Sequence, residues 1–405
     1  MTPIDAPHRA LLLENIHPEA HPALHSAGYE VSAEAGAMNE SDVIKALDGV
    51  ALLGVRSNTQ ITEKVLAEAP DLIAIGAFCI GTNQIDLAAA AERGVAVFNA
   101  PFSNTRSVVE LALAEIIALT RRLTEKDAAM HQGVWRKSAT GAHEVRSRRL
   151  GIVGYGNIGT QLSVLAENLG MQVSFFDTAD KLALGNARRC ESLEELLSSV
   201  DVVTLHVDGR AGNSGFFGER EFALMRERAI FLNLSRGFVV DYEALRDHLE
   251  SGHLAGAAVD VFPTEPKNAG EEFRSPLRGL SNVILTPHIG GSTEEAQRDI
   301  GSFVGGKLAD YARSGATQLS VNMPMLTLPD RAGEHRIVHI HRNTPGVLAA
   351  INAILAERSV NIDAQFLSTR GSVGYVITDV GRALDTSVCD LLRELPETIR
   401  LRVLS

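Results

Sequence analysis

Three glycines, Gly154, Gly156 and Gly159, form the spacing GxGxxG between the apolar run LGIV and a helical pattern. The first glycine permits a tight turn, and the second lets the backbone approach a pyrophosphate at the N-terminus of the helix that follows. The next apolar run ends at Asp177, where a dinucleotide-binding unit places the acid that accepts from ribose hydroxyls. The pattern predicts a dinucleotide site, and the charge of Asp177 favours NAD over NADP. The alternative is a structural turn with a surface aspartate.

Three polar residues follow strand-like runs further along the chain: Arg236 after IFLNLS, Glu265 after VDVFPT and His288 after VILTP. Carboxyl ends of parallel strands are where α/β proteins bind ligands. A guanidinium binds a carboxylate, an imidazole takes a hydroxyl proton, and a second carboxylate fixes the tautomer of that imidazole. Such a set suits oxidation of a 2-hydroxy acid by hydride transfer to a nicotinamide. A loop cap, a solvated carboxylate and an ordinary histidine are equally good interpretations from position alone.

The elements that must position these residues form two blocks of alternating strands and helices. In residues 1–103 the apolar runs ALLLENI, VALLGVRS, LIAIGAF and VAVFNAP predict strands, and ESDVIKAL, TEKVLAEA and DLAAAAERG predict helices. After a helix predicted over 107–122, a second block contains the runs LGIVGYG, VSFFD, VVTLHV, IFLNLS, AGAAVDVF and VILTPH. Such runs are typical of strands buried on both faces. We expect an α/β protein with two doubly wound, Rossmann-like parallel-sheet lobes and a further helix over 293–313.

Residues 336–405 form a separate unit after a linker at 326–335. Its strands are predicted in RIVHIHRN, IDAQFLSTR, VGYVITDV and TIRLRVL, and its helices in PGVLAAINAILAER and SVCDLLREL. The order βαββαβ is that of a ferredoxin-like domain. Thr344 is a candidate N-cap and Pro345 a candidate first helical residue.

Composition narrows the class of function. The 405 residues suffice for two or three domains, and a formal net charge of -12 argues against general binding of nucleic acid or of an anionic membrane. The three cysteines are widely spaced, so we expect no disulfide framework, no metal site and a reducing compartment. The N-terminus lacks the apolar run of a signal peptide. We therefore expect a cytoplasmic enzyme without a membrane partner.

Several motifs together resemble the D-2-hydroxyacid dehydrogenase family: GYGNIGTQL, LNLSRGFVVD, AAVDVFPTEP and TPHIGGSTEEAQ. Three more, CIGTNQIDL, FNAPFSNTRSVVEL and HIHRNTPGVL, resemble the branch that oxidises 3-phospho-D-glycerate in the phosphorylated serine pathway. The resemblance implies a discontinuous substrate-binding domain of residues 1–103 and 291–325, an NAD-binding domain of residues 104–290, and an ACT regulatory domain of residues 336–405.

The resemblance also implies roles for single residues. Arg236 would bind the substrate carboxylate, and His288 would be the acid and base, with Glu265 behind it. The other residues implied to contact NAD are Gly154, Gly156, Asn157, Ile158, Gly159, Asp177, Leu234, Ser235, Asp260, Ile289, Gly290 and Gly291, together with Arg236 and His288 themselves.

For the substrate phosphate, the resemblance points to the loop RSNT, with Arg56 and Ser57 as ligands because a guanidinium and adjacent N–H groups suit a phosphate. Relatives carry a second arginine where Asn58 stands here. Asn104 is a further substrate candidate, and Lys137, beside Trp135, could reach the cleft of a neighbouring subunit.

In the ACT domain, His341, Asn343 and, from the neighbouring subunit, Asn361 would bind L-serine. The alternative is that all three are turn and cap residues of a dimerisation module. Relatives have paired glycines before this domain, where this chain has Gly333 followed by Glu334, so we expect the coupling between the serine site and the active site to differ.

The resemblance thus implies NAD-dependent conversion of 3-phospho-D-glycerate to 3-phosphohydroxypyruvate, feedback inhibition by L-serine, a homotetramer, and a side activity that reduces 2-oxoglutarate to 2-hydroxyglutarate. Two alternatives stay open. One is a dehydrogenase for another D-2-hydroxy acid, and the other is a dinucleotide or serine sensor that performs no chemistry.

Overall fold

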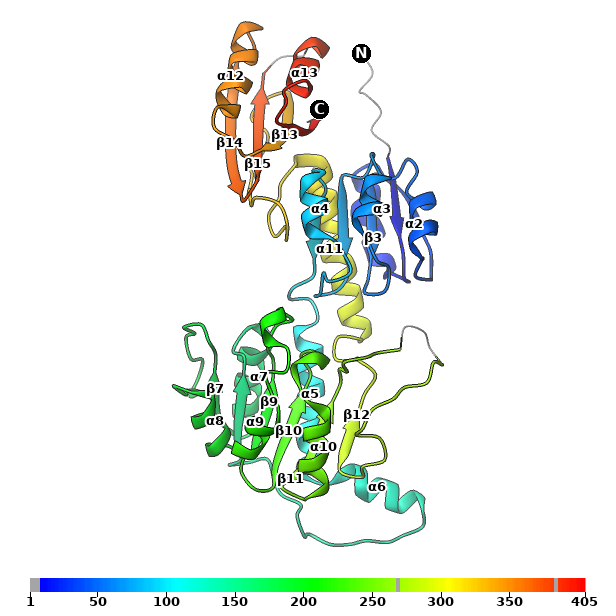
Figure 1. Cartoon of the computed structure of the whole chain (residues 1–405), viewed down its shortest axis with the longest axis vertical. Helices are drawn as coiled ribbons and strands as arrows, with labels where there is room; N and C mark the ends of the chain where they lie inside the picture. Colours follow the sequence, from blue (N-terminus) through cyan, green and yellow to red (C-terminus); the bar gives the residue numbers. More distant parts are fainter. Residues whose placement is uncertain (1–7, 267–269, 382–384, 405) are drawn as a thin grey trace. The chain divides into compact units, whose positions relative to one another are not determined.

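The computed structural model describes residues 8–266, 270–381 and 385–404. The chain divides into two compact units, one of Met1–Ser103 with Gln297–Ser405 and the other of Asn104–Ala296 (Figure 1). The first unit contains two sheets, of five and four strands, and the second contains one sheet of seven strands. The second of these units spans residues 104–296, and the NAD-binding domain that the resemblance implies spans residues 104–290.

The five-stranded sheet is parallel throughout, in the order β2-β1-β3-β4-β5. Its strands are β1 (Arg9–Leu12), β2 (Glu30–Ala33), β3 (Leu52–Val55), β4 (Ala74–Ala77) and β5 (Ala96–Asn99). Its helices are η1 (Pro18–Ala20), α1 (His21–Ser26), α2 (Glu40–Ala46), α3 (Glu63–Ala67), α4 (Leu87–Glu92) and α11 (Glu294–Ser314). Gly76 in β4 lets α11 approach closely, because a side-chain carbon there would lie 2.6 Å from Val304.

The seven-stranded sheet has the order β12-β11-β10-β9-β6-β7-β8, a doubly wound arrangement that reverses between β6 and β9. Its strands are β6 (Arg149–Val153), β7 (Gln172–Phe176), β8 (Arg188–Arg189), β9 (Val202–Leu205), β10 (Ala229–Asn233), β11 (Leu254–Val259) and β12 (Val283–Leu285). Its helices are α5 (Thr105–Thr120), α6 (Leu123–His131), α7 (Asn157–Asn168), α8 (Leu193–Ser199), η2 (Ala211–Asn213), α9 (Glu219–Leu224), η3 (Gly237–Val239) and α10 (Tyr242–Glu250). The central strands β9 and β10 are entirely buried, as their apolar runs predict.

The long helix predicted over 107–122 is α5, which runs from Thr105 to Thr120, and a second helix that was not predicted, α6, follows it. Arg122 has φ 53, in the left-handed region, and separates α5 from α6. No propensity rule marks this break, since arginine is a good helix former. Between α6 and β6, residues 132–148 have no helix or strand and carry Trp135, which is 77% exposed.

The four-stranded sheet is antiparallel, in the order β14-β15-β13-β16, as a ferredoxin-like domain requires. Its elements are β13 (His335–Arg342), α12 (Val347–Glu357), β14 (Ile362–Arg370), β15 (Val373–Val380), α13 (Thr386–Arg393) and β16 (Thr398–Leu404). Ile351 and Leu392 pack the two helices onto one face of the sheet. The predicted cap at Thr344 is wrong: α12 begins at Val347 after Gly346, whose φ of 95 a threonine would rarely adopt.

The linker predicted over 326–335 has no regular structure before β13 begins at His335. Its end is held by Arg336, which is 2% exposed and forms a buried ion pair with Asp379 at 2.7 Å. The same guanidinium donates to the carbonyl oxygens of Ser314 at 3.2 Å and Pro329 at 3.5 Å.

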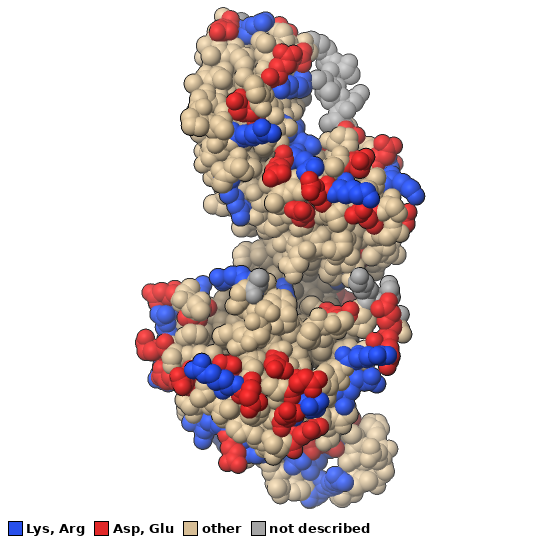
Figure 2. Space-filling view, viewed as in Figure 1, with Lys and Arg blue, Asp and Glu red and all other residues tan. Residues whose placement is uncertain are grey.

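Figure 2 shows acidic and basic side chains intermixed over the face in view, without one broad basic field. Within the described part of the chain, no helix combines the length and the apolar character that crossing a membrane would need.

Candidate active site

The glycine loop joins β6 to α7, and its glycines meet different constraints. Gly154 has φ 94 and packs against the carbonyl oxygen at the end of β9, while a side chain on Gly159 would overlap the carbonyl group of Gly154. Gly156 has no atom within 4 Å of the position of a side-chain carbon, so a ligand can approach its backbone. The first N–H groups of α7, on Asn157 and Ile158, have no acceptor within the helix. The loop therefore fits the pyrophosphate of a dinucleotide.

Asp177 follows β7, and its carboxylate is fixed beside this loop. One oxygen accepts from the N–H of Tyr155 at 2.8 Å and the other from the N–H of Ala179 at 2.8 Å. A carboxylate has about four lone-pair sites, so acceptors remain for ribose hydroxyls.

His288 and Glu265 lie on different loops and meet directly. The Nδ1 atom of His288 is 2.8 Å from Oε2 of Glu265. A carboxylate only accepts, so Nδ1 carries the proton that it donates to Glu265. Oε1 of Glu265 accepts from the N–H of Phe262 at 3.0 Å. The ring is therefore oriented, and Nε2 is left as the atom that can exchange a proton with a substrate.

The charges of this pair support each other. The hydrogen bond that His288 donates to Glu265 raises the pKa of His288 above its usual 6.5, against the opposing effect of burial. Burial works against ionisation of Glu265, but the hydrogen bonds from His288 and Phe262 and the charge of Arg236 outweigh it, so the pKa of Glu265 is lowered. The pair consequently favours a carboxylate beside an imidazole that readily accepts a proton.

Arg236 belongs to the same cluster, because its charge also acts on the pKa of His288. Its loop is fixed by Asn233, whose amide donates to the carbonyl oxygen of Arg236 at 3.1 Å. Gly237 comes next, and a side chain there would overlap the backbone of Phe262. That close contact holds the loop of Arg236 against the loop that leads to Glu265.

Asp260 anchors the turn that carries His288. It is 2% exposed and accepts from the hydroxyl of Thr286 at 2.6 Å and from the N–H groups of Ile289 at 2.8 Å and Gly290 at 2.7 Å. These bonds give Asp260 a positioning role, in addition to any contact with the cofactor. Of the other residues expected near the nicotinamide, Leu234 and Ser235 are buried, Ile289 is 41% exposed and Gly291 is half-buried.

Two of the expected substrate residues lie in this unit. Asn104 packs against Gly291, and the Oδ1 atom of Asn104 is buried without a partner among the described residues. Lys137 is exposed in the segment after α6, and no described residue of this single chain bonds to it.

Arg56 and Ser57 follow β3 in the other unit. Arg56 is half-buried and Ser57 is exposed. Two N–H groups of this loop, those of Asn58 and Thr59, donate to the buried carboxylate of Glu14 at 3.0 and 2.8 Å. They are therefore not available to a phosphate, and the expected phosphate site rests on the guanidinium of Arg56.

The expected serine ligands lie at two ends of one sheet. His341 and Asn343 are at the end of β13, where His341 pairs with Gly374, whereas Asn361 precedes Ile362, which pairs with Val380 at the other end of β15. His341 is 3% exposed, and its Nε2 atom has no partner among the described residues. A site that uses both His341 and Asn361 therefore needs two chains.

His206, which follows β9, was not among the predicted site residues. Its carbonyl oxygen touches the glycine loop, and its Nε2 atom lies 3.0 Å from the hydroxyl of Thr204. Burial lowers the pKa of His206 to about 4, so its ring is neutral beside the glycine loop. The sequence feature that could have identified His206 is its position directly after the apolar run of a predicted strand, as for Arg236 and His288.

Residues 113–290 match the family model described as "D-isomer specific 2-hydroxyacid dehydrogenase, NAD binding domain". Residues 337–400 match the model described as "AHAS small subunit-like ACT domain".

Similar proteins cover almost the whole chain. The D-3-phosphoglycerate dehydrogenase of Haemophilus influenzae is 50% identical over 395 residues, which is 97% of this chain and 96% of that protein. The enzyme of the same name from Dictyostelium discoideum is 47% identical over 98% of this chain and 97% of its own. Among solved structures, D-lactate dehydrogenase from Aquifex aeolicus, complexed with NAD and lactic acid, matches with a TM-score of 0.65 at 24% identity over 75% of this chain and 95% of that chain. The last similarity concerns the fold alone.

Proposed function

This chain belongs to the D-3-phosphoglycerate dehydrogenases, a branch of the D-isomer specific 2-hydroxyacid dehydrogenases, and we propose that it oxidises 3-phospho-D-glycerate to 3-phosphohydroxypyruvate. It is an NAD-dependent oxidoreductase. The observation that carries the proposal is the 2.8 Å contact between His288 and Glu265 beside Arg236, in the unit that also holds the glycine loop.

In the proposed reaction, Arg236, His288 and Glu265 have different roles. Arg236 pairs with the substrate carboxylate, and Nε2 of His288 takes the hydroxyl proton as the carbonyl group forms. Bound NAD supplies the acceptor for the hydride that leaves the same carbon. Glu265 stabilises the protonated ring, and the reverse reaction returns the proton from Nε2 to the carbonyl oxygen.

For the substrate phosphate we propose Arg56 as the principal ligand. Its guanidinium can bind a phosphate bidentately, and Asn58 brings no second charge to the loop. Arg56→Gln should raise KM for 3-phosphoglycerate by about tenfold or more, the loss of a charge-assisted hydrogen bond, with the affinity for NAD unchanged.

The proposal is tested by following NADH absorbance with 3-phosphoglycerate and NAD while the product is trapped. We expect turnover with the phosphorylated substrate and little with D-glycerate or D-lactate. Efficient turnover of an unphosphorylated acid in place of 3-phosphoglycerate would overturn the substrate. We also expect slow oxidation of NADH with 2-oxoglutarate, because Arg236 can hold the carboxylate of any small 2-oxo acid.

For regulation, we propose that L-serine binds between the ACT domains of two chains and inhibits the enzyme, in a cytoplasmic homotetramer. The positions of His341 and Asn361 at opposite ends of the sheet support a site shared between chains. Asn361→Ala should raise the serine concentration needed for inhibition without changing kcat, and sedimentation should give the mass of four chains. An enzyme that stays monomeric and is still inhibited by serine would contradict this arrangement.

A further inference from the structure

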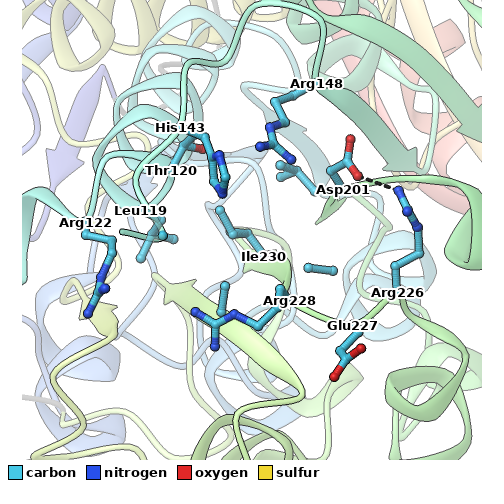
Figure 3. A pocket seen from close by; sticks show the side chains of 14 residues that line it. Leu119, Thr120, Arg122, His143, Arg148, Asp201, Arg226, Glu227, Arg228 and Ile230 are labelled. Atoms are coloured by element: carbon cyan, nitrogen blue, oxygen red, sulfur yellow. Dashed lines mark hydrogen bonds and ion pairs between the residues drawn. The ribbon is translucent and has the colours of Figure 1, made fainter. Parts of the chain in front are cut away.

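A cavity of about 210 Å³ lies within the unit Asn104–Ala296 (Figure 3). Its walls include residues at or directly beside the positions where β6, β9, β10 and β11 begin. The glycine loop, His206, Arg236 and Asp260 follow the opposite ends of these same strands. The cavity lies at the amino ends of these strands, and the glycine loop and the His288 cluster lie at their carboxyl ends. The cavity is therefore separate from the predicted dinucleotide site.

Basic side chains from three segments surround this cavity: Arg122 at the end of α5, His143 and Arg148 before β6, and Arg226 and Arg228 before β10. In Figure 3 the side chains of His143 and Arg148 lie in the upper part of the view and that of Arg228 in the lower part, with the apolar Leu119 and Ile230 between them. The four arginines outnumber the two carboxylates that also line the cavity, those of Asp201 and Glu227, although the formal net charge of the chain is -12.

Only some of these cations are neutralised by the protein. Arg122 pairs with Glu125, and Arg226 pairs with Asp201 at 2.7 Å, an aspartate that also binds Arg149. The guanidinium of Arg148, in contrast, has no hydrogen bond or ion pair with any residue that the structure describes. The guanidinium of Arg228 donates to one carbonyl oxygen, that of Gly252 at 3.3 Å. Its charge is the smallest of the effects that lower the pKa of Glu125.

An independent observation at the same place is the hydroxyl of Thr120. Thr120 is 4% exposed and lines the cavity, and its Oγ1 atom has no hydrogen-bond partner among the described residues. A helical threonine normally bonds a carbonyl group in the preceding turn. A buried hydroxyl without a partner destabilises the fold unless a bound group satisfies it.

We propose that this cavity binds a phosphate group, either inorganic phosphate or the phosphate of a small metabolite. A tetrahedral oxyanion presents acceptors on several sides, as donors from Thr120, Arg148 and Arg228 require, whereas a planar carboxylate is satisfied by one guanidinium. The cavity is smaller than the roughly 300–1,000 Å³ of sites for drug-sized ligands and far larger than one water needs. Bound phosphate joins the end of α5 to the segment that carries Trp135 and to the turn before β10.

The test is a titration of the full-length protein, saturated with NADH, with inorganic phosphate at constant ionic strength. The wild type should show a saturable rise in Tm, and Arg148→Gln and Arg228→Gln should each weaken phosphate binding at least tenfold. Arg146→Gln is the matched control, because its guanidinium pairs with Glu144 and does not line the cavity. Arg56→Gln should also keep the response, which separates this site from the substrate phosphate.

Thr120→Val supplies a variant that keeps the shape of the side chain. It should raise Tm without phosphate, since an unpartnered buried hydroxyl is removed, and should reduce the rise in Tm that phosphate produces. Phosphoserine is the metabolite probe: tighter binding than inorganic phosphate, lost in the same variants, assigns the site to a metabolite.

Three results would overturn the proposal. One is a wild-type protein without a saturable response, or with the same response to chloride. Another is a response lost in Arg56→Gln and kept in Arg148→Gln and Arg228→Gln. The third is a change of oligomeric state in the cavity variants with an unchanged phosphate response, which would assign these cations to a contact between chains.

Discussion

The Nδ1 atom of His288 donates to Oε2 of Glu265 over 2.8 Å, although 23 residues separate the two along the chain. His288 makes this contact from a backbone with φ 54, in the left-handed region that few non-glycine residues adopt. The hydrogen bonds of Asp260 to the next two backbone N–H groups offset the cost of that conformation. The backbone around His288 is thus held in the conformation that brings its ring to Glu265.

Replacing His288 by alanine should lower kcat by about 10²- to 10⁴-fold, the usual contribution of a general base. The affinity for NAD, measured by quenching of protein fluorescence or by calorimetry, should stay nearly unchanged. His131→Ala, an exposed histidine on α6, is the control. Normal turnover by the His288 variant would show that the mechanism is wrong.

The pH dependence of the reaction should follow His288. Oxidation needs the neutral ring, so kcat/KM should rise with pH through a pKa above 6.5, and reduction should fall through the same pKa, because Glu265 raises it. Glu265→Gln removes that charge, so both limbs should move to lower pH, with a loss of rate between about 10- and 10⁴-fold. If the pH profiles of oxidation and reduction have the same apparent pKa in this variant as in the wild type, the titrating group is not His288.

Asp177 should govern the choice of cofactor. Asp177→Asn keeps an acceptor for the N–H of Tyr155 but removes the negative charge that faces the ribose. The preference for NAD over NADP, as a ratio of kcat/KM values, should fall by about 10- to 100-fold, since a hydrogen bond to a charged group contributes about 1.5–3 kcal/mol. Asp180→Asn, an exposed neighbour, should leave the ratio unchanged.

Glu115 should make the stability of the protein depend on pH. It is 3% exposed on α5, and burial together with the charge of Asp260 raises its pKa to about 8. Between about pH 4.3, its unfolded pKa, and pH 8 the folded chain keeps a proton that the unfolded chain has lost. The free energy of unfolding should therefore decrease as pH rises across this window, by up to about 1.4 kcal/mol per pH unit.

Urea denaturation at several pH values checks this expectation. Glu115→Gln should flatten the decrease, because glutamine has no proton to lose. Glu110→Gln, an exposed glutamate of the same helix, should not. Equal slopes in the wild type and the Glu115 variant would mean that this carboxyl is ionised in the folded protein.

Removing one partner of the buried pair of Arg336 and Asp379 should lower the free energy of unfolding more than replacing both partners by apolar residues does. Asp379 is 0% exposed, so Asp379→Asn leaves an uncompensated buried cation and should reduce the free energy of unfolding by about 3–5 kcal/mol. The double variant Arg336→Met with Asp379→Leu should recover most of that loss. Guanidinium denaturation measures both, and a double variant as unstable as the single one would contradict the argument.

Local patterns predicted the elements that bury apolar runs, and they failed where an element forms through its neighbours. Strand β2 has no apolar run, and three of its four residues are exposed; it exists because Glu30–Ala33 pair with β1 at the edge of the sheet. Strand β8 has two arginines and pairs only with β7. Helix α1 was likewise not predicted.

Site residues could be predicted where they directly follow a predicted strand. The strand ends after β7, β10 and β12 pointed to Asp177, Arg236 and His288, since strand period and glycine spacing are local properties. The loop of Arg56 shows the limit: nothing near it in the sequence indicates that Glu14, more than forty residues earlier, takes two of its N–H groups.

The order of residues thus specified the types of chemical group and the elements that carry them: a glycine turn before a helix, and a base, an acid and a guanidinium after strands. Folding decided which of them meet. It directed Nδ1 of His288 toward Glu265, and it left the hydroxyl of Thr120 and the guanidinium of Arg148 around a cavity at the other edge of the sheet. Hydrogen bonds and ion pairs act over about 3–4 Å, and only the packing of the elements brings distant residues that close.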